Sequence, residues 1–268
     1  MIDEATIEKL IKRTDQSANI SDITVKRFGS IFNTLFEIRF RKNNEECRLM
    51  LKDYDDWAGL KWLPATIYAM GTKSFSISSR NRLAKEYAAN KVLKKKGFKV
   101  PAILFINRTR HLLIEEFIEG EALTYMIRKI ISNGRATENE KNTIKKVGET
   151  FALVHRSQIT LGDTKPDNVI ITKDGKICLV DLEQARKGGD PAWDLSEFLY
   201  FSCHFVSLTD STQGISIITK SFIDGYLSAG GSRNAVVDAG RIKYMRLYLI
   251  ISLPPVLGRV SSILRDFA

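Results

Sequence analysis

Residues 161–185 read LGDTKPDNVIITKDGKICLVDLEQA, and this stretch decides the fold that we expect. Within it, residues 169–172 and 177–180 are apolar runs rich in β-branched side chains. Residues 173–175, KDG, stand between the two runs, and an Asp-Gly pair in that place is typical of a tight hairpin turn. The stretch therefore predicts a short loop followed by a β-hairpin.

Four polar side chains are expected to meet at one end of this hairpin. The loop before it carries Asp163, Lys165 and Asn168, and the second strand returns Asp181 to the neighbourhood of that loop. Phosphoryl transfer uses such a group. One carboxylate orients the attacking hydroxyl, a lysine neutralises the moving phosphoryl group, and an amide with a second carboxylate holds Mg²⁺. The alternative is a hairpin whose Asp and Asn side chains only cap turns.

The stretch resembles the protein-kinase-like superfamily. Residues 163–168, DTKPDN, look like the kinase catalytic loop D-L-K-P-x-N, and residues 181–183, DLE, lie where D-F-G would lie. Leu161 replaces the histidine that normally opens this loop. The resemblance implies ATP and Mg²⁺ as cofactors. It also implies that Asp163 and Lys165 are catalytic residues, and that Asn168 and Asp181 are magnesium ligands.

The N-terminal sequence predicts two strands, at residues 23–28 and 34–40, joined by GSIFN at residues 29–33. In a kinase the glycine-rich loop covers the nucleotide phosphates at this place. The resemblance therefore implies that Gly29 and Ser30 bind the cofactor. Taken alone, the segment is an ordinary hairpin turn with a single glycine.

A lysine and a glutamate further along the chain are expected to bind the nucleotide phosphates. Residues 47–52 predict a third strand that ends in Lys52, and residues 81–96 predict an amphipathic helix in which Glu86 is the only acid. The resemblance implies an ion pair between the two side chains, which orients the lysine in a kinase. The alternative for Lys52 is a solvated surface lysine.

The segment EFIEG, residues 116–120, is similar to the kinase hinge E-[FY]-x-x-G. The resemblance implies that Glu116 and Ile118 lie at the cofactor, with the backbone groups of Ile118 against the adenine edge. Glu115 stands where an apolar residue is usual in the family. The base pocket is therefore expected to differ in shape from that of related kinases.

Beyond residue 120 the pattern is mostly helical. We expect helices at residues 122–131, 138–155, 198–205, 215–226 and 242–251. Pro254 and Pro255 are expected to end the last of them. Asp194 has two interpretations, because it either caps a helix or binds the backbone of the catalytic loop, as an aspartate does in related folds.

These expectations make an α+β, bilobal protein-kinase-like fold. Further strands at residues 100–106 and 111–117 complete an antiparallel five-stranded sheet, which forms an N-terminal nucleotide-binding lobe with one main helix, residues 1–118. A mainly helical catalytic lobe follows, residues 119–268. Residues 54–79 form an insertion with two tryptophans, which either packs on the small lobe or docks a partner.

The composition is that of a basic protein with a core of its own. The chain has 268 residues and 44% hydrophobic content, and its 41 Lys and Arg exceed its 31 Asp and Glu to give a formal net charge of +10. That excess of positive charge favours a nucleotide, a nucleic acid or an acidic protein as a binding partner. Many of the basic residues fall in the helix at residues 80–99, which is either a solvated face or the footprint of an acidic partner or an RNA-associated complex.

The compartment expected from the sequence is the cytoplasm. No apolar run is long enough to span a membrane, and the first residues, MIDEATIEKL, do not look like a signal peptide. The three cysteines, Cys47, Cys178 and Cys203, are far apart and lack metal-ligand spacing. An odd number of scattered cysteines is typical of a reducing environment.

The leading functional hypothesis is an ATP- and Mg²⁺-dependent Ser/Thr protein kinase. The spacing from Arg82 to Glu86 and the EFIEGE segment resemble the small archaeal kinases around the KEOPS-complex kinase. The DLE segment and DPAWDL at residues 190–195 are closer to aminoglycoside and choline kinases, so phosphorylation of a small hydroxyl compound is an alternative. The reduced glycine loop, Leu161 and Glu183 together leave a third hypothesis, a weakly active nucleotide-binding adaptor.

Overall fold

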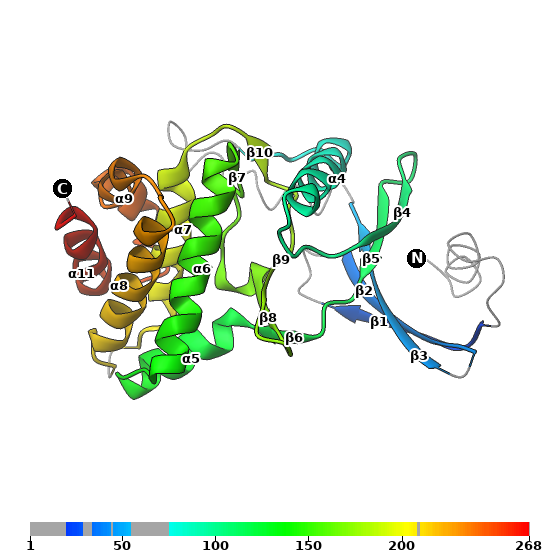
Figure 1. Ribbon diagram of the computed structural model, residues 1–268, viewed down its shortest axis with the longest axis horizontal. Helices are drawn as coiled ribbons and strands as arrows, with labels where there is room; N and C mark the ends of the chain where they lie inside the picture. The colour runs from blue at the N-terminus through cyan, green and yellow to red at the C-terminus, as the bar shows by residue number, and fades with distance from the viewer. Residues whose placement is uncertain (1–19, 29–33, 44, 55–74, 208–209, 268) are drawn as a thin grey trace.

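The computed structural model describes residues 20–28, 34–43, 45–54, 75–207 and 210–267. A β-sheet lies at one end of the molecule with helix α4 beside it, and a group of helices forms the other end (Figure 1). The α+β, bilobal protein-kinase-like class expected from the sequence is confirmed. Among the described residues, no helix combines the length and the apolar character that a membrane crossing requires.

Five antiparallel strands form the sheet, in the order β1-β2-β3-β5-β4. They are β1 (Ile20–Phe28), β2 (Thr34–Lys42), β3 (Glu45–Asp53), β4 (Ile103–Asn107) and β5 (Leu112–Glu116). The register pairs Ile38 with Leu49 and Leu51 with Ile114. Because side chains alternate across a strand, these four lie on one face, where they form a buried apolar cluster.

Helix α4 (Ser79–Lys95) covers part of the opposite face. Its Leu83 packs with Tyr54 and with Leu113, whose side chain points away from the first cluster. Gly97 follows the helix in a left-handed conformation, with φ +86°. That conformation is typical of a helix end and is easiest for glycine, so the helix and its end are both as the sequence predicts.

The helical part of the described chain contains α5 (Leu123–Asn133), α6 (Glu138–Arg156), α7 (Pro191–Ser202), α8 (Gln213–Ser228), α9 (Arg233–Ala239), α10 (Ile242–Met245) and α11 (Pro254–Arg265). Phe151, Phe198 and Phe222 meet in its core, with ring centroids 4.4 to 5.6 Å apart. A Cβ at Gly148 of α6 would lie 2.0 Å from the carbonyl oxygen of Phe222. Only glycine therefore lets α6 and α8 approach so closely.

The predicted hairpin consists of β8 (Val169–Thr172) and β9 (Ile177–Leu179), and β6 (Gly120–Ala122) joins it to make a three-stranded sheet. Gly175 occupies the turn with φ +73°. The N–H of Leu179 donates to the carbonyl of Lys99 at 3.0 Å, which ties the hairpin to the segment after α4. In Figure 1 the hairpin lies between the five-stranded sheet and the helices.

The end of the chain departs from the expectation. Residues 242–251 do not form one helix, because α10 is short and gives way to a 3₁₀ turn, Arg246–Tyr248. The two prolines begin α11 instead of only ending its predecessor. A proline fits the first turn of a helix, where its missing N–H costs nothing, and it forces the residue before it, Leu253, out of the helical region.

Candidate active site

Asp194 of α7 supports the backbone of the expected catalytic loop. Its carboxylate is 0% exposed and accepts hydrogen bonds from the N–H groups of Leu161 at 2.6 Å and Gly162 at 2.9 Å. His155 Nε2 lies 3.0 Å from the same carboxylate. The cap of α7 is Asp190, so the geometry decides between the two interpretations of Asp194 in favour of the backbone contact.

Asp163 and Lys165 lie together at the tip of this loop. The Lys165 Nζ is 3.0 Å from Oδ1 and 3.2 Å from Oδ2 of the buried Asp163. Burial alone would lower the pKa of Lys165. The carboxylates of Asp163, Glu197 and Asp181 outweigh burial and raise this pKa above its usual value, so the lysine stays charged. Glu197 of α7 also accepts from the N–H of Thr164 at 2.7 Å, which fixes the loop a second time.

Asn168 and Asp181 are neighbours at the end of the hairpin. The N–H of Val180 donates to the Asn168 carbonyl at 3.0 Å. The Asn168 Nδ2 donates to the backbone carbonyl of Asp163 at 3.0 Å, while its amide oxygen accepts no hydrogen bond from the described residues. Asp181 has φ +57°, which is rare outside glycine. Its carboxylate forms no hydrogen bond or ion pair within the described ranges.

Lys52 of β3 is held by two glutamates. Its Nζ lies 2.5 Å from Oε1 of Glu86 on α4 and 3.0 Å from Oε1 of Glu115 on β5. The Tyr54 hydroxyl donates to the second oxygen of Glu86. All three charged side chains are buried. The structure therefore brings together the pair that the sequence suggested and adds Glu115 to it.

The charges around Lys52 do not balance. Burial alone would lower the pKa of Lys52, but the carboxylates of Glu115, Glu86 and Asp181 together raise it well above its usual value. Burial raises the pKa of Glu86 to about 7. The charge of Glu115 adds to this rise, and the charge of Lys52 opposes it. One ammonium thus faces three carboxylates. Glu86 and Glu115 are paired with Lys52. The oxygens that remain for a cation are therefore the Asp181 carboxylate and the Asn168 amide oxygen, which are the kinds of ligand that Mg²⁺ prefers.

Helix α4 also contacts residues 181–184, the DLEQ segment. The Arg82 Nη1 lies 3.0 Å from Oε2 of Glu183, and the two side chains are 3% and 5% exposed. The side-chain amide of Gln184 exchanges two hydrogen bonds with the backbone of Ser76, at 2.8 and 3.0 Å. The segment that carries Asp181 is therefore fixed to α4 and to the chain just before it.

Ile118 lies between β5 and β6 and is half-buried. Its backbone N–H and C=O form no hydrogen bond within the part of the chain that the structure describes. The exposed carboxylate of Glu116 accepts from the N–H of Ala102 at 3.1 Å, so that side chain is engaged with the neighbouring strand. Gly29 and Ser30 lie outside the described residues, as do residues 55–74 of the insertion.

Sequence reasoning missed several residues of this site. Glu197 and the Arg82–Glu183 ion pair were not singled out for a role, and Glu115 was noticed only as a departure from an apolar position. A signal existed for Arg82, because residues four apart on a helix share a face and Arg82 precedes Glu86 by four. The partner of each group lies far away in the sequence, so the pairing itself has no local signal.

Comparisons with known proteins identify the family of this chain. A family model described as RIO domain matches residues 68–208. A probable serine/threonine-protein kinase BUD32 homolog of Archaeoglobus fulgidus is 27% identical over 153 residues, which make up 56% of this chain and 69% of that protein. The EKC/KEOPS complex subunit bud32 of Dictyostelium discoideum is 25% identical over 95 residues, 35% of this chain and 37% of that protein.

Two further matches were found, one to a protein kinase and one to a solved structure. The protein kinase kin1 of Schizosaccharomyces pombe is 25% identical over 80 residues, so the match spans 30% of this chain and only 9% of that kinase. The solved structure of the bifunctional kinase-methyltransferase WbdD has a TM-score of 0.42 and 16% identity, over 76% of this chain and 46% of that one. The RIO-domain match covers more than half of the sequence, and the chain therefore belongs to the RIO-domain family of protein-kinase-like atypical kinases.

Proposed function

We propose that the protein is an ATP- and Mg²⁺-dependent phosphotransferase that acts on Ser and Thr hydroxyls of proteins. The observation that carries the proposal is the position of Asp181. Its carboxylate is one of the charges that raise the pKa of both Lys52 and Lys165, so it lies within electrostatic range of a strand of the sheet and of the loop. A nucleotide phosphate chain needs such a set of cations and metal ligands.

Asp163 orients the acceptor hydroxyl and receives its proton. Its carboxylate is ion-paired with Lys165, which keeps it ionised, and among the described residues its Oδ1 accepts no hydrogen bond, so a hydroxyl brought beside it can donate there. Lys165 lies beside it and remains charged, so it stabilises the negative charge that develops on the transferred phosphoryl group. The hydrogen bonds from the loop to Asp194 and Glu197 keep both side chains in place.

Asn168 and Asp181 supply oxygen ligands for Mg²⁺, and Lys52 binds the nucleotide phosphates while Glu86 orients it. When bound, Mg²⁺ neutralises charge on the phosphates and aligns them for in-line attack. The backbone groups of Ile118, which form no hydrogen bond with the described residues, bind the adenine edge. They lie at a proposed hinge between two proposed lobes, residues 1–118 and 119–268. Glu116, Gly29 and Ser30 complete the proposed nucleotide contacts.

Protein hydroxyls are the proposed acceptors because two of the matched relatives are named as protein kinases, one of them a serine/threonine-protein kinase. The cytoplasm is the proposed compartment, since all three cysteines are free thiols. A multi-protein complex is a proposed setting, since one relative is named as a complex subunit.

Replacing Asp181 by Ala tests the function. The carboxylate makes no hydrogen bond or ion pair with the described residues, so Asp181→Ala should lower the unfolding free energy by only about 1–2 kcal/mol, the cost of alanine in a left-handed backbone, and reduce phosphate transfer from radiolabelled ATP to background. Asp224→Ala, which removes an exposed aspartate from α8, is the matched control and should retain activity. Transfer at the normal rate by the Asp181→Ala protein would refute the assignment.

A further inference from the structure

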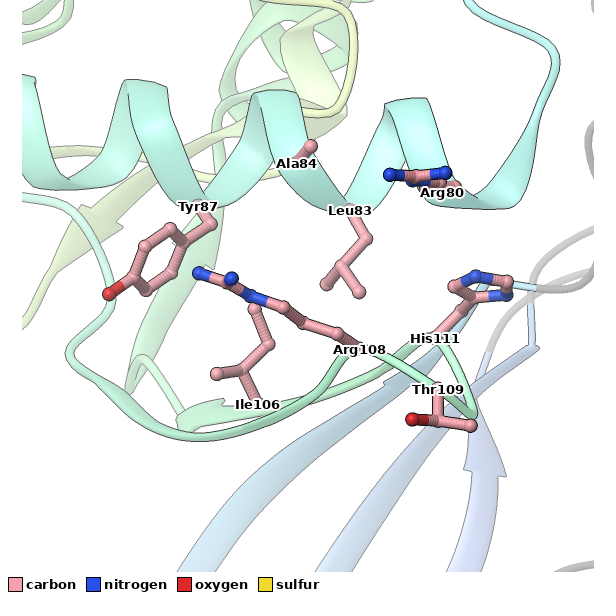
Figure 2. Close-up of a pocket in the computed structure, with 8 residues that line it drawn as sticks. All are labelled: Arg80, Leu83, Ala84, Tyr87, Ile106, Arg108, Thr109 and His111. Atoms are coloured by element: carbon pink, nitrogen blue, oxygen red, sulfur yellow. The ribbon is translucent and has the colours of Figure 1, made fainter.

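A second candidate site lies on another side of α4. A cavity of about 630 Å³ opens between this helix and the β4–β5 turn. Leu83 points from α4 toward strand β4 and the β4–β5 turn, and Arg108 reaches from that turn toward Tyr87 (Figure 2). The volume falls within the range of ligand sites in proteins. Arg80 and Tyr87, one heptad apart, share the cavity side of the helix, whereas Glu86 is turned about 100° from Tyr87, toward Lys52 and Glu115.

The lining combines an apolar floor with positive charge. Leu83, Tyr87 and Ile106 supply the floor, and the guanidinium groups of Arg80 and Arg108 are exposed at the rim. None of the lining residues is an acid. Within the described ranges, neither arginine has a carboxylate partner. The cavity therefore attracts an anion that has an apolar part.

The wall formed by the β4–β5 turn has a fixed shape. His111 adopts a left-handed backbone with φ +52°, which is strained for a residue with a side chain. Its Nδ1 lies 3.0 Å from the Ser79 hydroxyl, and its carbonyl accepts from the N–H of Tyr54 at 3.0 Å. Contacts to the first turn of α4 and to the chain after β3 hold this residue. The cavity is thus formed before any ligand arrives.

We propose that this cavity is the docking site for an acidic segment of a partner protein. An aromatic or aliphatic side chain of the segment occupies the floor over Leu83 and Ile106, and carboxylates beside it pair with Arg80 and Arg108. Arginine forms two parallel hydrogen bonds to a carboxylate, which suits an exposed rim. An apolar centre surrounded by charge is typical of protein interfaces, whereas strands of nucleic acid are bound along rows of aromatic side chains.

Phage display with a random peptide library on the immobilised full-length protein tests the proposal. The peptides that bind should contain an aromatic or aliphatic residue flanked by Asp or Glu. Their affinity, measured by fluorescence anisotropy, should fall about tenfold in Arg80→Glu and in Arg108→Glu, because each variant replaces an ion pair by repulsion. Arg110→Glu makes the same charge change on the same turn outside the cavity and should bind normally. Thermal unfolding of each variant shows that it is folded.

Three results would overturn the proposal. The first is a set of selected peptides without acidic residues, and the second is an equal loss of affinity in Arg110→Glu. The third is tight binding of a labelled single-stranded RNA that Arg80→Glu and Arg108→Glu abolish, because the cavity would then serve nucleic acid. Peptide binding does not require catalysis, so this test and the Asp181→Ala test succeed or fail independently.

Discussion

Arg82 of α4 forms a buried ion pair with Glu183, two residues after Asp181, with the Arg82 Nη1 3.0 Å from Oε2. Glu86, one turn further along the same helix, holds Lys52. One helix thereby sets the positions of the proposed phosphate-binding lysine and of the proposed metal ligand. A displacement of α4 would move both groups, so the geometry of the site depends on how this helix packs.

The Arg82–Glu183 pair should be coupled in stability. Arg82→Met or Glu183→Leu alone should lower the unfolding free energy by about 3 kcal/mol, because each removes the buried ion pair and leaves one of its two charges in the interior. The double variant should lose much less than the sum, since neither charge then remains. Urea unfolding of the four proteins measures the coupling. Additive losses in the double variant would show that the two side chains do not interact.

The negative charge of the native Glu115 side chain should make nucleotide binding weaker than it would be without it. It shares Lys52 with Glu86 and adds a negative charge next to the proposed phosphate site. Glu115→Gln should therefore tighten the binding of a non-hydrolysable ATP analogue with Mg²⁺, by up to about tenfold. Calorimetric titration measures the dissociation constant, and Glu121→Gln, at an exposed glutamate of β6, is the control. Equal or weaker binding by Glu115→Gln would contradict the prediction.

Glu86 should make stability depend on pH. Folding raises its pKa from 4.5 to about 7, so the folded protein binds more protons than the unfolded chain between these values. The unfolding free energy should therefore fall as the pH rises through that window, by up to about 3 kcal/mol, and this contribution should level off above it. Urea unfolding at a series of pH values measures the slope. Glu86→Gln should flatten it, and an unchanged slope would exclude Glu86 as its source.

Asp194 should support the catalytic loop in a way that asparagine cannot. Asp194→Asn replaces one of the two oxygens that accept from Leu161 and Gly162 by an NH₂ group, which leaves a buried N–H without an acceptor. The loss should be about 1–3 kcal/mol in the unfolding free energy, with a lower transfer rate. Asp224→Asn, at an exposed aspartate of α8 that forms no hydrogen bond or ion pair with the described residues, is the control and should change stability little. Equal effects of the two variants would argue against the special role of Asp194.

The sequence predicted the strands, the main helices and the hairpin because each has a local pattern. Alternation fixes which face of β3 carries Leu49 and Leu51, and the turn glycine at position 175 fixes where the hairpin reverses. One failure lay in residues 242–251, whose apolar side chains fit a single helix but form only the short α10 and a 3₁₀ turn.

The sequence by itself determined which residue types form the proposed site and their order along the chain. These are Lys52, the DTKPDN loop and Asp181. Only the tertiary structure decided which charges meet. The ion pairs of Lys52 with Glu115 and of Arg82 with Glu183 join residues more than sixty positions apart, and their energies depend on distance and burial that no spacing encodes. The positive cavity beside α4 arises in the same way, because it exists only where the β4–β5 turn meets that helix.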